Sequence, residues 1–80
     1  MNKDEVFASA LKEEKLLKLK LKNLEDEISS KEDELLSLQE KLCLEEVYSN
    51  PKESERINKE VQILEDLIAN LYEEWELLQA

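Results

Sequence analysis

The sequence of 80 residues contains no glycine and no histidine, and it has one cysteine and one proline. Without glycine, the chain cannot build the phosphate-cradling loops of P-loop or dinucleotide-binding proteins. Without histidine, and with Cys43 as the single thiol, the usual metal and nucleophile constellations are missing as well. One cysteine excludes a disulfide within the chain and is typical of a reducing, cytoplasmic setting. We therefore expect no catalytic residue, metal site or cofactor in this chain.

Long hydrophobic runs are missing too, since no stretch approaches the roughly 20 apolar residues that cross a bilayer. No signal-peptide pattern opens the sequence, so we expect a cytoplasmic protein that does not enter the membrane.

Negative charge prevails in the sequence, with a formal net charge of −10. Residues 1–22 hold six lysines against four acids, whereas residues 23–80 hold five bases against seventeen acids. The acidic balance argues against wholesale binding of nucleic acid, but the first quarter of the chain is locally basic.

A heptad ladder of apolar residues fills most of the chain and breaks once, at Asn50-Pro51. The spacing alternates between three and four residues, which places one narrow apolar seam on each of two long helices. We therefore predict an all-α fold, in which two long helices form an antiparallel coiled-coil hairpin. The rungs are Leu17, Leu21, Leu24, Ile28, Leu35, Leu38 and Leu42, followed by Ile57, Val61, Leu64, Ile68, Leu71, Trp75 and Leu78.

The predicted boundaries divide the chain into a linker or frayed start at 1–8 and a hairpin at 9–80. Within the hairpin we expect helices over 9–43 and 51–79 and a tip over 44–50. Asn50 is a suitable N-cap, because Pro51 fits the first helical position and Glu53 follows three residues after the cap. Leu44, Val47 and Tyr48 are too apolar for a solvated loop and should cover the helix ends.

Antiparallel pairing of the two seams predicts which rungs meet. It places Leu42 near Ile57 and Leu21 near Leu78, and it packs Trp75 against Leu24. Trp75 is more readily explained as a core anchor than as a stacking platform for a base, which requires an exposed ring. The expected core anchors are Trp75, Leu24, Leu42 and Tyr48.

One rung is occupied by a charge, Lys31. Its stem could lie along the seam while its ammonium reaches water or an acid such as Glu65. Alternatively, a single polar residue in the seam could fix the alignment of the helices at some cost in stability.

Three apolar residues, Leu36, Ile63 and Leu67, lie beside the seam rather than in it. They could broaden the core, or they could contact a second hairpin in a weak homodimer, because small scaffolds often need such support.

The lysines near the start of the chain are candidate contacts for nucleic-acid phosphates. At about 100° per residue, Lys15, Lys18 and Lys22 share a sector of roughly 60° that points away from the seam, with Lys12 at its edge. No aromatic residue is interleaved with them, so sequence reading by base stacking is not supported. A solvated face balanced by Glu13 and Glu14 remains the alternative. The candidate contact residues are Lys12, Lys15, Lys18, Lys20 and Lys22.

Several short motifs resemble the C-terminal domain of ABC-F proteins, which are soluble, duplicated ATPases of the ABC superfamily. They are the tip L-C-L-E-E-V-Y, the entry Y-S-N-P, the ending Y-E-E-W-E-L-L, and a lysine-rich beginning followed by L-E-D-E-I. The resemblance covers roughly residues 10–79.

This resemblance implies an antiparallel two-helix coiled coil without catalytic activity. It also implies a parent protein whose ATP and Mg²⁺ sites lie in ATPase domains of the same polypeptide, outside this chain. The implied role is on the ribosome, in translation regulation or in protection from ribosome-targeting antibiotics. Some members use this hairpin to bind nucleic acid, but the acidity of the present chain makes DNA a less favoured partner than ribosomal RNA. A protein-interaction or dimerisation coiled coil without nucleic-acid binding is the alternative function.

Overall fold

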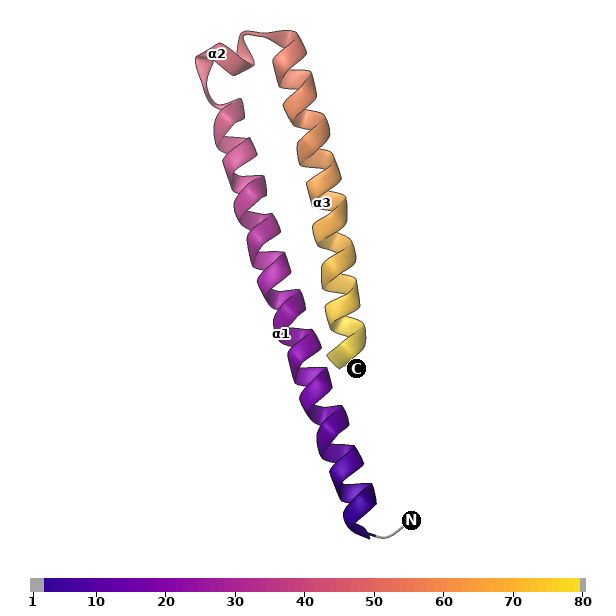
Figure 1. Cartoon of the computed structure of the whole chain (residues 1–80). Helices are drawn as coiled ribbons and strands as arrows, with labels where there is room; N and C mark the ends of the chain where they lie inside the picture. Colours follow the sequence, from indigo (N-terminus) through magenta and orange to yellow (C-terminus); the bar gives the residue numbers. More distant parts are fainter. Residues whose placement is uncertain (1–2, 80) are drawn as a thin grey trace.

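The computed structural model describes residues 3–79 of the chain, apart from the side chain of Asp4. It contains three helices, α1 (Lys3–Leu42), α2 (Glu45–Tyr48) and α3 (Pro51–Gln79). The long helices α1 and α3 run side by side in opposite directions, and the single turn α2 closes one end of the rod (Figure 1). The rod measures 69 × 15 × 14 Å along its principal axes. The predicted all-α antiparallel hairpin is therefore confirmed.

The apolar seam lies where the heptad spacing predicts it. Every rung from Leu21 to Leu42 and from Ile57 to Leu78 is buried or partly buried, whereas most other positions of these helices are exposed. Leu17 departs from the pattern because it is 39% exposed. Leu17 lies beyond the end of α3 along the rod, so no opposing helix packs against it.

The core is a single layer, and its most buried residues are not the expected anchors. Ile57 is 1% exposed, and the other buried residues are Ile28, Val47, Ile68 and Leu71. Trp75, Leu24 and Leu42 are partly buried. Two helices enclose a side chain from one direction only, so a large ring near the end of the rod keeps one side in water.

The tip reverses the chain without glycine, in two small steps rather than one tight turn. Leu44 adopts an extended conformation before α2, and Ser49 and Asn50 lead from α2 into α3. The Asn50 side-chain oxygen accepts a hydrogen bond from the Glu53 backbone N–H at 3.3 Å, which confirms Asn50 as the N-cap of α3. The Ser54 hydroxyl donates to the Val47 carbonyl at 2.7 Å and ties α2 to α3. No described residue has a positive φ, so the absence of glycine causes no strain here.

Only one of the three apolar tip residues forms the expected cover. Val47 is 8% exposed, whereas Leu44 is 46% and Tyr48 61% exposed. The expectation that Leu44 and Tyr48 are buried, and with it the role of Tyr48 as a core anchor, was wrong. Because α2 is one turn long, it turns a single side chain toward the seam, and Tyr48 lies about 100° around the helix from Val47.

Helix α1 begins six residues before the predicted start at residue 9. Residues 3–8, expected to be a linker, are helical, while residues 1–2 lie outside the described residues. The reason is local: the segment has no proline or glycine, and a helix can extend beyond its packed region when no residue breaks it.

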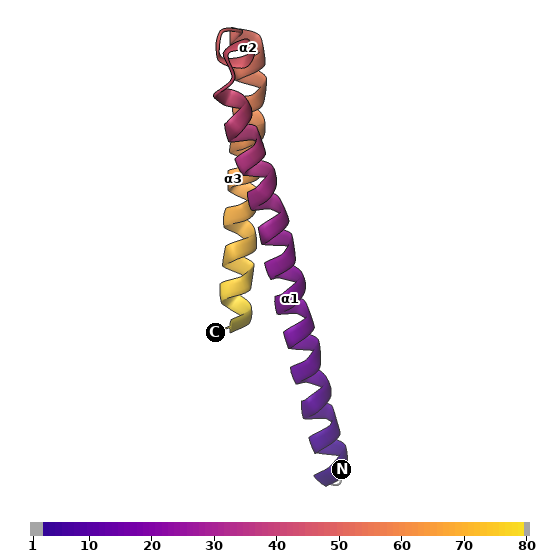
Figure 2. The same ribbon diagram turned by 90° about the vertical axis from the view of Figure 1, so that its left-hand side faces the viewer.

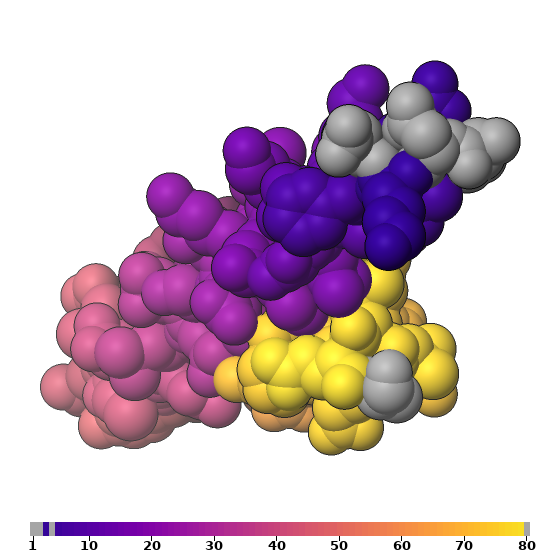
Figure 3. All heavy atoms as spheres, turned by 90° about the horizontal axis from the view of Figure 1, so that it is seen from below, coloured from indigo at the N-terminus to yellow at the C-terminus, as the bar shows by residue number. Residues whose placement is uncertain are grey.

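The first part of α1 extends past the end of α3 and forms an overhang, defined here as residues 3–20. Each of its described side chains is exposed, and Leu21 is the first one with partial cover. At 1.5 Å per residue the overhang is about 27 Å long. Figure 2 shows α1 and α3 crossing at a shallow angle, with the overhang running on beyond the end of α3. Figure 3 looks onto this open end of the rod.

Lys31 occupies a seam position, as predicted, but its ionic partner differs from the expected one. Its side chain is 29% exposed, and its ammonium lies 3.6 Å from a carboxylate oxygen of Glu34 on the same helix. Glu65 is not the partner. Glu34 is favoured because it lies one turn away on the same helix, so the Lys31 ammonium reaches it while the aliphatic part of the side chain stays in the seam.

Replacement of Lys31 by leucine should raise the thermal midpoint of unfolding. The leucine would fill the seam with apolar surface, worth about 1 kcal/mol, which corresponds to about 4–8 °C in a domain of this size. Circular dichroism during heating measures the change. Lys59→Leu is the matched control, because Lys59 also pairs with a glutamate on its own helix but is 74% exposed. An unchanged or lower midpoint for Lys31→Leu would show that the position is not part of the apolar seam.

Candidate functional site

The candidate lysines lie at the open end of the rod, where α1 has no opposing helix. Lys12, Lys15, Lys18 and Lys20 are on the overhang, and Lys22 follows immediately after Leu21. All five are exposed. Because α1 is continuous, Lys15, Lys18 and Lys22 share one face, opposite the seam. Lys20 lies about 170° around the helix from the middle of that face and does not belong to it.

Acidic neighbours neutralise part of this basic face. The Lys18 ammonium is 3.2 Å from a carboxylate oxygen of Glu14, one turn away, and both side chains remain well exposed. Such an exposed pair is worth little and exchanges readily for another anion. Lys12, Lys15 and Lys22 form no ion pair among the described residues. The overhang therefore presents accessible ammonium groups.

Two aromatic side chains of α3 donate hydrogen bonds to carboxylates of α1. The Trp75 indole N–H donates to Glu25 at 3.1 Å, and the Tyr72 hydroxyl donates to Glu32 at 2.9 Å. These bonds lie next to the seam and join α3 to α1 in one register. A ring held in this way is not free to stack on a base. Heptad reasoning missed both acceptors, because an acid beside the seam has no signature of its own in the sequence.

The hydrogen bond to Glu32 also changes the acidity of Tyr72. Because its proton is shared with the Glu32 carboxylate, the pKa of Tyr72 is raised above the ordinary value of 10.0, with desolvation and the nearby negative charge as smaller causes.

At the start of α3, the Arg56 guanidinium interacts with two glutamates. It donates to Glu53 and to Glu60, the latter at 3.0 Å. The hydrogen bond from Arg56 holds the pKa of Glu53 below its ordinary value, and the same bond raises the pKa of Arg56. This exposed cluster places a carboxylate in the first turn of α3, where the helix dipole favours negative charge.

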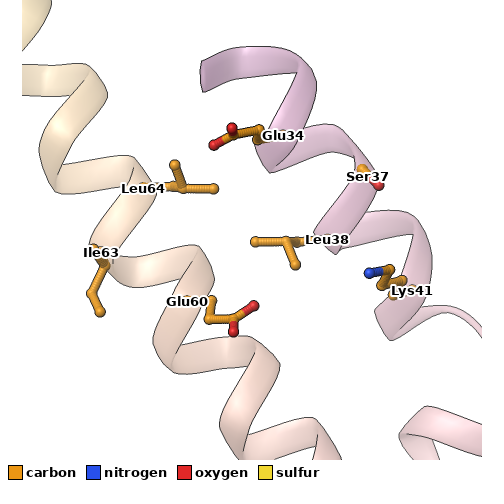
Figure 4. Close-up of a pocket in the computed structure, with 7 residues that line it drawn as sticks. All are labelled: Glu34, Ser37, Leu38, Lys41, Glu60, Ile63 and Leu64. Carbon is orange, nitrogen blue, oxygen red and sulfur yellow. The ribbon is translucent and has the colours of Figure 1, made fainter. Parts of the chain in front are cut away.

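A groove of about 430 Å³ opens between α1 and α3 in the half of the rod nearer the tip. Leu38 and Leu64 point toward each other across it, and Ile63 points outward (Figure 4). Charged side chains at its edges are Glu34, Lys41 and Glu60. The groove is shallow and open, and it offers an apolar strip rather than an enclosed ligand cavity.

The apolar residues beside the seam do not form one patch. Ile63 is 67% exposed and lies at the groove with Glu34. Leu36 is 55% exposed but stands about 160° around α1 from Glu34. Leu36 and Ile63 therefore lie on different faces of the rod and do not share one side-by-side contact, which was one of the two alternatives for these residues. Leu67 is partly buried and broadens the core.

No group of three or more metal-ligating side chains converges in the part of the chain that the structure describes. Cys43 is exposed, and its thiol donates weakly to the Gln39 carbonyl at 3.5 Å. None of the described helices is long and apolar enough to cross a membrane. What the molecule presents is a rod with a basic open end and an apolar groove.

These features define a helical-hairpin domain. The family model described as "ABC transporter C-terminal domain" matches residues 12–80, which is most of the chain. The chain therefore belongs to this family of ABC-protein C-terminal domains, and the expectation of a C-terminal domain from an ABC protein is confirmed. No curated protein and no solved structure matched the chain.

The raised pKa of Tyr72 gives a test of the contact between α3 and α1. The contribution of this hydrogen bond to stability is fully present below the ordinary tyrosine pKa and is lost as the pH rises through the higher pKa of the folded state. Titration of tyrosinate absorbance should show one tyrosine ionising at a higher pH in the wild type than in Glu32→Gln. Glu65→Gln serves as the control, because Glu65 forms no bond with Tyr72. Identical titrations of wild type and Glu32→Gln would contradict the bond.

Proposed function

We propose that this chain is the non-catalytic C-terminal coiled coil of a cytoplasmic ABC-F ATPase and helps it to associate with ribosomal RNA. The family membership and the exposed lysines of the overhang support this proposal. Lys15 and Lys18 lie on the overhang and Lys22 lies just after it, so the lysine face is at the end of the rod away from most of the acidic hairpin. This position allows the basic end to approach phosphates while the acidic body stays away from them.

The remaining functions of the parent would lie in other domains of the same polypeptide. ATP and Mg²⁺ would be bound and hydrolysed by its ATPase domains, which are also the nearest partners of the hairpin. The hairpin would act as a rigid arm in translation regulation or antibiotic resistance. Its own contribution would be a contact of a few phosphates, because three lysines share the outward face.

The chemistry of the overhang favours phosphate contact over reading of bases. Lys15, Lys18 and Lys22 are flexible point charges, and Trp75 is held by Glu25. Contacts of this kind position a protein on RNA and carry no sequence information. DNA would present the same phosphates, but it is a less favoured partner for a chain with a net charge of −10, whose charge repels a long uniform duplex.

Charge reversal of Lys15, Lys18 and Lys22 to glutamate should weaken the binding of structured RNA at low salt by at least about tenfold. It should also lower the slope of log K against log salt by about 2, because roughly three phosphate contacts are lost. Fluorescence anisotropy with a labelled RNA hairpin measures both quantities.

The matched control reverses Lys41, Lys52 and Lys59, three exposed lysines in the half of the rod nearer the tip. It changes the net charge equally and should leave most of the affinity intact. Equal losses of RNA affinity in both triple variants would show that the effect comes from net charge alone. RNA binding that survives reversal of Lys15, Lys18 and Lys22 would refute their role.

A protein-interaction hairpin without nucleic-acid binding is the second candidate, and the groove favours it. Ile63 is 67% exposed beside the groove, which suits an apolar side chain of a partner helix. Ile63→Asp separates the candidates, because it removes the apolar strip and leaves the overhang lysines unchanged. A wild type that binds no RNA, together with loss of partner binding in Ile63→Asp, would favour this second candidate.

A further inference from the structure

The outward face of α1, opposite the seam, carries its charges in two blocks. We call it the outer stripe: at about 100° per residue its members fall within a sector of roughly 80°. The half nearer the N-terminus is basic and the half nearer the tip is acidic. The members are Leu11, Lys15, Lys18, Lys22, Asp26, Ser29, Asp33, Leu36 and Glu40.

The outer stripe is available for contact along its whole length. All of its members are exposed, with Leu11 at 40% and Leu36 at 55%. Lys15, Lys22, Asp26 and Asp33 form no ion pair among the described residues. The stripe lies on the side of α1 away from α3, so the hairpin itself does not cover it.

The spacing of these charges is self-complementary when two copies of α1 run antiparallel. Side chains then lie at the same level when their residue numbers have a constant sum. Lys15 with Asp33 and Lys22 with Asp26 both give a sum of 48, and Leu11 with Leu36 gives 47. A parallel arrangement would instead place lysine beside lysine and aspartate beside aspartate, which is repulsive.

We propose that the outer stripe is a homodimer interface in which two hairpins associate antiparallel through α1. Lys15 and Lys22 of each copy pair with Asp33 and Asp26 of the other. The two leucines of each stripe meet the leucines of the other near the ends of the contact. Each pair occurs twice, because the two-fold axis passes near residue 24.

The size of the interface predicts a weak, salt-sensitive dimer. From Leu11 to Leu36 the stripe is about 38 Å long. With a contact width of about 10 Å, the two copies bury about 800 Å² in total, below the 1,200–2,000 Å² of stable complexes. Exposed ion pairs supply most of the specificity, so added salt weakens the dimer.

Charge-swap variants test the interface, under reducing conditions that prevent a Cys43 disulfide. The double variants Lys15→Glu/Lys22→Glu and Asp26→Lys/Asp33→Lys should each raise the dimer dissociation constant by at least about tenfold, because four attractive pairs become repulsive. An equal mixture of the two should regain association, since every pair between unlike chains is then attractive. Sedimentation equilibrium at low salt measures all three samples and the wild type.

Two further measurements make the outcome decisive. The quadruple variant, which carries both swaps in one chain, should form a homodimer again. Circular dichroism should show that each variant remains helical. A wild type that stays monomeric at high concentration and low salt would overturn the proposal. So would a mixture that associates no better than its separate components.

The proposed homodimer can be tested independently of the RNA contact. Asp26→Lys/Asp33→Lys leaves all the overhang lysines in place, so it should lose self-association and keep RNA binding. Failure of the dimer with intact RNA binding refutes only the interface, and the reverse result refutes only the RNA contact.

Discussion

The antiparallel seam between α1 and α3 is the interaction on which every other feature of the rod depends. It is one residue wide and alternates three- and four-residue steps, so each helix buries a single stripe and leaves most of its surface in water. A core of this kind has no second layer that could compensate for a poor rung. This explains why the rungs are almost entirely Leu, Ile and Val, and why a single charged rung, Lys31, keeps its ammonium at the edge of the seam beside Glu34.

The seam also explains the construction of the tip. The two helices must stay in one register while the chain reverses, and the sequence lacks glycine, the residue that most readily adopts the positive φ of a tight turn. The tip instead inserts the short helix α2, whose Val47 is buried at the end of the seam. Ser54 binds the Val47 carbonyl and Asn50 caps α3, so the backbone groups freed at the break find partners. Where the heptad pattern stops, the short helix α2 thus continues the apolar core.

The hairpin could be predicted from the sequence because heptad spacing and helix caps act between residues close in the chain. The rungs from Leu21 onward, the N-cap at Asn50 and the seam position of Lys31 all follow from such local rules. The exposure of Tyr48 could not be predicted, because it depends on which side of a single helical turn faces the seam. The bonds from Trp75 to Glu25 and from Tyr72 to Glu32 were also missed. They join residues 50 and 40 positions apart, beside a seam whose pattern specifies only apolar rungs.

The extra length of α1 has consequences for how its lysines can be used. A helix of about 18 unpacked residues is only marginally stable in water, so its continuity with the packed part of α1 keeps it helical. This rigidity holds Lys15 and Lys22 on one face, where both RNA phosphates and the aspartates of a second copy could reach them. The two proposed partners exclude each other, since one ammonium cannot satisfy both at close range. RNA that binds only the monomer therefore shifts the self-association equilibrium toward monomers by mass action. In the dimer, the acidic half of each outer stripe covers the lysines of the other copy with negative charge. Dissociation exposes these lysines on an overhang that is already helical.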